Sequence, residues 1–147
     1  MRFKYIRLML KTSIFYFIIG VLIGLLMYLS YWFNELSWAY ALRAVHTHII
    51  LVGFVIQMIM GVALWMFPSV PSQEKTIEKR LTPESHGIRL YVIFNSGVVL
   101  RSVFEPFARS SSIAFYLGLA GVILQIIGII YFAFLIFPRI RGPLPAK

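Results

Sequence analysis

Cysteine is absent from this 147-residue chain, and acidic residues are scarce, with five Asp and Glu against fourteen Lys and Arg. Without cysteine there can be no disulfide, no thiolate metal site and no covalent haem attachment through a C-x-x-C-H motif. The few carboxylates are scattered, so no pair of them is placed for acid–base chemistry. The chain also lacks a Gly-rich phosphate loop and a nucleophile–base set. An enzyme of the soluble type is therefore disfavoured.

Charged residues make up only 13% of the chain, whereas hydrophobic residues make up 60%. A soluble domain of this size must cover its core with polar surface, which this composition does not provide. The net charge of +9 comes from basic residues that cluster at the ends of apolar runs rather than on one continuous face. Because anionic lipid headgroups explain this distribution better than nucleic acid does, we expect a lipid bilayer as partner and no nucleic acid.

Four apolar runs are long enough to cross a hydrocarbon core of about 30 Å at about 1.5 Å per helical residue. They predict an all-α, integral membrane four-helix bundle in one domain, with helices over about residues 12–33, 44–67, 88–105 and 112–137. The first run is too long for the apolar region of a signal peptide, and no small-residue cleavage site follows it. The third run is the weakest because Arg101 interrupts it, and a re-entrant or surface segment is its alternative interpretation.

Lysine and arginine are distributed unevenly between the two sides that these helices define. Most of them lie in the N-terminal segment, the long loop after the second run and the C-terminal tail, whereas the other two loops hold only Arg43 and Arg109. The positive-inside rule therefore predicts that both termini lie in the cytoplasm, an N-in/C-in topology. We expect a multi-pass protein of the inner (cytoplasmic) membrane of a prokaryote.

The second run carries the most informative polar residues. At about 100° per residue, His46, Gly53 and Gln57 fall within about 20° of one line on a regular helix. A histidine followed by a small residue two turns deeper gives the relief that a flat macrocycle needs beside its ligand. His48 lies about 200° round the axis, so the two histidines of one chain cannot bind one iron from opposite sides. Hydrogen bonding between helices is the alternative role for both.

Two arginines and a third histidine complete the set of notable polar residues. Arg101 is costly in a bilayer unless it is paired, and its partner is either Glu105 at i+4 or an anionic ligand group such as a haem propionate. Arg43, on the outer rim, would be a second cation. His86 lies near the cytoplasmic start of the third helix, as a solvated loop or helix-start residue. It is nearly a bilayer away from the other histidines and too far to join them.

Small residues repeat at helical spacing in the first and last runs. Gly20 and Gly24 form a small-xxx-small pair, and Gly118, Gly121 and Gly128 form a narrow stripe. Because helices in lipid associate through close packing, ordinary helix–helix contact is the preferred interpretation of both.

The start of the second run also carries a family resemblance. The stretch Arg43-Ala-Val-His46-Thr-His48-Ile-Ile-Leu-Val-Gly53 continues through Gly61 to Phe67-Pro68. It resembles the second helix of the catalytic subunit of haem–copper oxidases, in particular that of the cbb3-type oxidases, the nitric oxide reductases and short subunit-I-like relatives. In that superfamily the histidine of an R-x-x-H motif is an axial ligand of the low-spin haem b. The resemblance implies haem b as cofactor, with His46 as an iron ligand.

The third run, with Phe94-Asn-Ser-Gly-Val-Val-Leu-Arg101, is similar to the third helix of those relatives. The resemblance covers about residues 15–137, which correspond to the first four helices of a twelve-helix subunit. The family's reaction centre, and the second axial ligand of its low-spin haem, come from later helices that this sequence does not contain. With only three histidines, we expect no oxygen or nitric oxide reductase activity from this chain alone.

Three functional hypotheses follow. The first is a membrane cytochrome b for electron transfer or for binding nitric oxide or oxygen, as a homodimer in which the partner's His46 or His48 completes the iron coordination. The second is a non-catalytic accessory or assembly subunit of a larger respiratory oxidase or reductase complex. The third is a copper site on His46 and His48 with Met58 or Met60, although these methionines lie about three turns deeper. The candidate cofactor-binding residues are Arg43, His46, His48, Gly53, Gln57 and Arg101.

Overall fold

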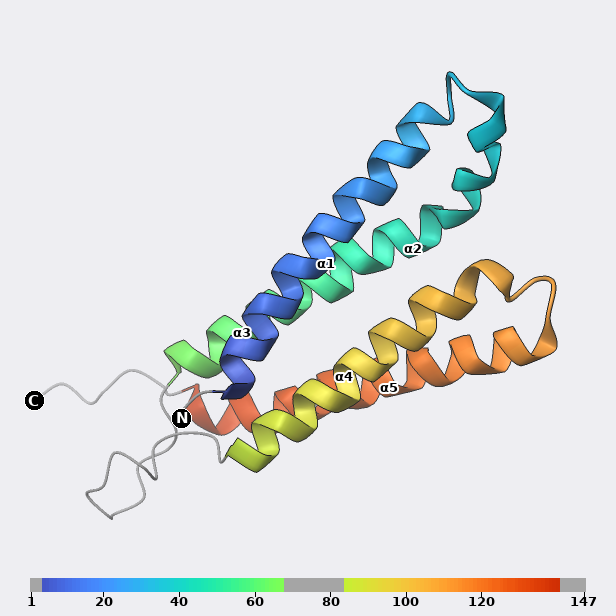
Figure 1. Cartoon of the computed structure of the whole chain (residues 1–147). Helices are drawn as coiled ribbons and strands as arrows, with labels where there is room; N and C mark the ends of the chain where they lie inside the picture. The colour runs from blue at the N-terminus through green and yellow to red at the C-terminus, as the bar shows by residue number, and fades with distance from the viewer. Residues whose placement is uncertain (1–3, 68–83, 141–147) are drawn as a thin grey trace, which may run out of the picture.

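The computed structural model describes residues 4–67 and 84–140, and every regular element in these two ranges is helical. The described chain forms two antiparallel hairpins (Figure 1). Within the described ranges, four helices are long and apolar enough to cross a membrane. The predicted all-α fold with four long apolar helices is therefore confirmed. Below, the end of the molecule that carries residues 30–42 and 105–111 is called the outer end, following the orientation predicted from charge.

The first helix, α1, spans Lys4–Leu29 and so starts well before residue 12 and ends before residue 33. Long basic side chains near the end of a membrane helix can reach the headgroup region, so the charges at positions 4, 7 and 11 do not terminate it. At the outer end the chain leaves the helix at Ser30, whose Oγ donates a hydrogen bond to the carbonyl of Met27 at 2.6 Å.

The second span is one continuous helical path of changing type. It opens with the 3-10 helix η1 (Asn34–Leu42), continues as α2 (Arg43–His48) and the π-helix η2 (Ile49–Ile56), and ends as α3 (Gln57–Met66). The regular helix expected over residues 44–67 is therefore interrupted. Wide π turns occur frequently at functional sites, and this one follows the two histidines of α2 directly.

The second hairpin pairs α4 (Glu84–Phe104) with α5 (Ser112–Ile136). Arg101 lies inside α4, so the third run forms a full-length helix rather than a short re-entrant segment. Short 3-10 helices follow both elements, η4 (Glu105–Phe107) after α4 and η5 (Phe137–Arg139) after α5. The two helices pack closely, with their backbones in contact where Gly97 of α4 faces Gly121 of α5.

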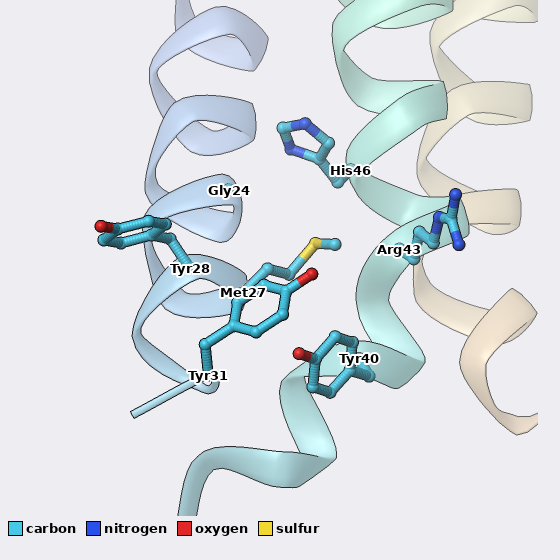
Figure 2. A pocket seen from close by; sticks show the side chains of 7 residues that line it. All are labelled: Gly24, Met27, Tyr28, Tyr31, Tyr40, Arg43 and His46. Atoms are coloured by element: carbon cyan, nitrogen blue, oxygen red, sulfur yellow. The ribbon is translucent and has the colours of Figure 1, made fainter. Parts of the chain in front are cut away.

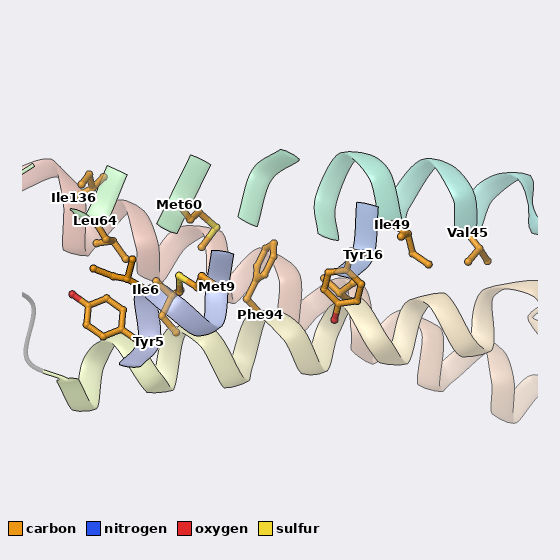
Figure 3. Packing of buried hydrophobic residues seen from close by; sticks show 12 residues of the cluster. Tyr5, Ile6, Met9, Tyr16, Val45, Ile49, Met60, Leu64, Phe94 and Ile136 are labelled. Carbon is orange, nitrogen blue, oxygen red and sulfur yellow. The ribbon is translucent and has the colours of Figure 1, made fainter. Parts of the chain in front are cut away.

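The buried core is concentrated toward the inner end, where α1, α3, α4 and the end of α5 meet (Figure 3). Its largest fully buried side chains include Tyr5, Met9, Leu64 and Phe94. Polar contacts also tie α1 to α4 in this half of the molecule, because Tyr16 Oη donates to Asn95 Oδ1 at 3.0 Å. This packed region anchors α1 against α3, and it thereby fixes how the outer halves of α1 and α2 meet.

Candidate functional site

His46 lies on α2 with its imidazole against the backbone of α1. Its Nδ1 is 2.8 Å from the carbonyl oxygen of Gly20. A Cβ added at Gly24 would come within 2.9 Å of His46 Cε1, closer than real carbon contacts allow. The glycine pair on α1 therefore supplies both the hydrogen-bond acceptor and the space that hold this ring.

The hydrogen bond also fixes which nitrogen of His46 carries the proton. A backbone carbonyl only accepts, so Nδ1 must be the protonated nitrogen and Nε2 retains its lone pair. Among the described residues Nε2 has no hydrogen-bond partner. Metal-binding histidines usually donate their second N–H to a carbonyl or carboxylate in this way. His46 thus has the protonation pattern that a metal-binding histidine requires.

A cavity of about 400 Å³ lies beside the imidazole, between the outer ends of α1 and α2 (Figure 2). Its lining residues are Gly24, Met27, Tyr28, Tyr31, Tyr40, Arg43 and His46. Tyr28 and Tyr31 are largely exposed, so the cavity opens to the surroundings and does not enclose a ligand. In Figure 2 the guanidinium of Arg43 points away from the imidazole. Its exposed, flexible side chain nonetheless begins on the cavity wall.

Gly53 and Gln57 face α1, as His46 does, but neither lines the cavity. A Cβ at Gly53 would lie 2.9 Å from two ring atoms of Tyr16, which occupies the hollow that the glycine creates. Gln57 is 1% exposed, and its Nε2 donates to the carbonyl of Met9 at 3.0 Å. The space beside Gly53, which the sequence suggested for a macrocycle, is thus filled by the side chain of Tyr16. These two residues pack α1 against the second span.

His48 lies on the other flank of α2, facing α4. Its Nε2 is 3.5 Å from Glu105 Oε1, and Arg101 Nε is 3.4 Å from Glu105 Oε2. One carboxylate therefore joins α2 to the outer end of α4 and pairs with Arg101 one helical turn away. His48 and Arg101 form a cluster of their own and are not brought together with His46, although both lie at a similar depth.

The remaining histidine and the deeper methionines are engaged in packing. His86, in the first turn of α4, is half-buried rather than solvated, with Nδ1 2.6 Å from Tyr131 Oη on α5. Ser13 Oγ contacts Met58 Sδ at 3.7 Å, and Met60 is 2% exposed in the core. Within the described residues, no three His, Asp or Glu side chains are grouped to hold a metal ion.

Five cavity residues were not predicted as site residues: Gly24 as the neighbour of the imidazole, Met27, Tyr28 and Tyr31 at the outer end of the first hairpin, and Tyr40 on η1. Met27, Tyr28 and Tyr31 follow Gly24 by three, four and seven residues, and this spacing was the available signal, because such residues share one helical face. Tyrosines are also expected in the aromatic belt at the membrane interface, so their presence in the sequence does not by itself indicate a binding role.

Comparison of the chain with family models, with curated proteins and with solved structures finds no match in any of the three. Function is therefore inferred from the chemistry of the residues themselves and from the resemblance carried by α2.

Proposed function

We propose that this chain is a membrane cytochrome b that binds haem b through Nε2 of His46 and serves electron transfer or the binding of a small gas such as nitric oxide or oxygen. Its location would be the inner membrane of a prokaryote. The observation that carries the proposal is the 2.8 Å contact between His46 Nδ1 and the Gly20 carbonyl, which leaves the lone pair of Nε2 free to bind a metal on a side chain that lines an open cavity.

The residues around His46 fit a haem in part. A haem would supply an iron that changes oxidation state by one electron, and the chain's task is to hold and orient it. Arg43 starts on the cavity wall with an exposed side chain, so it can turn toward an anionic propionate at the outer rim. Gly53 does not contribute to the fit, because Tyr16 fills its hollow.

The chain supplies one histidine on this face and no second. His48 faces α4 and pairs with Glu105, while His86 lies at the inner end. A low-spin haem with two imidazoles therefore needs a ligand from outside the chain. Where none is supplied, the sixth position would be free for nitric oxide or oxygen, so the ligand count decides between the two roles.

The test is an optical spectrum of the purified protein before and after reduction with dithionite. We expect a Soret band, with sharp α and β bands in the reduced form of a six-coordinate haem. His46→Ala should abolish this spectrum. His86→Ala is the matched control, because it also removes a half-buried, hydrogen-bonded histidine but lies at the inner end of α4, far from the cavity. The proposal would be contradicted if wild-type protein showed no bound haem after reconstitution with excess haem and removal of the unbound haem. An unchanged spectrum in His46→Ala would contradict it as well.

An accessory or assembly subunit of a larger respiratory complex is the second candidate. The same hydrogen bond favours it, because a histidine bonded to the Gly20 carbonyl also serves simply to join two helices. On this alternative the purified protein is colourless but co-purifies with an oxidase or reductase. His46→Ala would then weaken the α1–α2 contact without any spectroscopic effect.

A further inference from the structure

We infer that the missing iron ligand is His46 of a second copy of this chain, so that two chains share one haem across a two-fold axis along the membrane normal. This inference rests on the proposed haem binding and names the partner that completes the site. An isologous pair is the commonest form of protein oligomer, and it presents the same residue from both sides.

Depth in the bilayer limits which residue the partner can offer. Two copies inserted in the same direction are related by an axis perpendicular to the membrane, and such an axis keeps every residue at its own depth. The two ligands of one iron must lie at the same level, so the partner's ligand comes from the level of His46. Of the three histidines in the sequence, His86 is in the first turn of α4 at the opposite end of the bundle and is excluded.

Availability separates the two histidines that remain. His48 has its Nε2 at 3.5 Å from a Glu105 oxygen, between α2 and α4. Nε2 of His46 has no hydrogen-bond partner among the described residues, and its ring lines an open cavity. The partner's His46 is therefore the histidine that can bind iron without first breaking a contact within its own chain.

The face through which the copies meet follows from what already covers α2. Its flank toward α4 is closed, since Val45 and Ile49 are 4% and 6% exposed in the core (Figure 3). The free surface near the cavity is the lipid-facing side of the first hairpin, where Leu25 and Tyr28 are 51% and 62% exposed. This apolar strip, here called the hairpin face, is the surface that a second copy would cover.

Charge supports the same arrangement. A two-fold axis beside the cavity brings the Arg43 side chains of the two copies to the same outer rim, where like charges repel. A haem b carries two propionates, which equal the two arginines in number and oppose them in sign. A pair without haem would leave this repulsion uncompensated, so we expect haem to strengthen the pairing.

The first experiment counts haem and mixes copies. Wild-type protein saturated with haem should contain one haem for two chains. When equal amounts of wild-type and His46→Ala chains are paired at random and locked by a cross-link before haem is added, the six-coordinate signal should fall to roughly a quarter of the all-wild-type value, because both copies must carry the histidine. One haem per chain, or a fall to only half, would overturn the inference while leaving haem binding by His46 intact. No haem at all would overturn both.

The second experiment uses the absence of native cysteine. A single Tyr28→Cys variant on the hairpin face should form a disulfide-linked dimer in membranes, and more of it when haem is added. Ile123→Cys on α5 is the matched control, since Ile123 is also lipid-facing, at 49% exposed, but lies on the other hairpin. Equal cross-linking at both positions, or none at Tyr28→Cys in haem-loaded protein, would overturn the inference. So would a single copy of this chain that shares its haem with a different subunit.

Discussion

Alanine at Gly121 of α5 is expected to destabilise the second hairpin, whereas alanine at Gly118, one turn earlier on the same helix, is not. A Cβ at Gly121 would lie 2.7 Å from the backbone nitrogen of Arg101 and 2.9 Å from the carbonyl oxygen of Gly97, both on α4. Neither atom can turn aside as a side chain could. A Cβ at Gly118 meets no atom within 4 Å.

The size of the effect follows from these distances. Non-bonded carbon contacts settle at about 3.5–4.0 Å, so α4 and α5 must move apart locally by about 1 Å. Overpacking of this kind costs about 1–3 kcal/mol. Replacing glycine by alanine inside a helix returns about 1 kcal/mol through helix propensity, but both variants share this gain. The two variants should therefore differ by about 1–3 kcal/mol, or roughly one to two powers of ten in the unfolding equilibrium.

Reversible unfolding in mixed micelles, followed by circular dichroism as the fraction of denaturing detergent is raised, measures this difference directly. We expect Gly118→Ala to unfold at or above the wild-type midpoint and Gly121→Ala clearly below the midpoint of Gly118→Ala. If the two variants unfolded at the same midpoint, the close backbone approach of α4 and α5 would be wrong. A lower midpoint for Gly118→Ala would also show that the space beside it is filled.

Three further changes test the rest of the structure. Gly24→Ala should push the imidazole of His46 away from the Gly20 carbonyl. Haem affinity should then fall by about 10–100-fold, as it does when a metal ligand loses a supporting hydrogen bond. An unchanged haem titration would contradict this. Tyr16→Phe removes one hydrogen bond between α1 and α4 and should cost about 0.6–1 kcal/mol in the same unfolding assay. The exposed Tyr116→Phe should cost nothing measurable, and equal losses would refute the contact. Glu105→Gln leaves an arginine without its carboxylate and should cost about 1–3 kcal/mol, so wild-type stability in that variant would show that the ion pair contributes little.

The four spans were predictable because each is a long apolar run, and such runs have few alternatives in a bilayer. The start of α5 at Ser112 coincides with its prediction, since polar residues mark that boundary. The start of α1 at Lys4 did not, because a basic residue signals the end of an apolar run but does not end a helix. The π-helix Ile49–Ile56 was also missed. Its shifted hydrogen bonds depend on how neighbouring helices pack, which periodicity does not encode.

The candidate site was predictable only as far as one helix determines it. Helical periodicity alone places His46 and His48 on different flanks of α2, and the structure has one against α1 and the other against α4. Whether Gly53 leaves room for a ligand depends instead on α1, where Tyr16 is the residue that reaches it. A hollow opposite a glycine exists only if the facing helix does not fill it, so no reading of α2 by itself could decide the question.

The glycines of α1 show that helix packing and ligand binding do not exclude each other in such a protein. Gly20 and Gly24 were interpreted as packing residues, and they do let the second span approach closely. That same approach brings the Gly20 carbonyl to 2.8 Å from His46 Nδ1, and a free Nε2 follows from this contact. The signal for the proposed iron ligand is therefore divided between a histidine on one helix and a glycine pair on its neighbour. A variant that separates α1 from α2 should lose both tight packing and haem. A variant that removes only the imidazole should lose the haem and keep most of the packing.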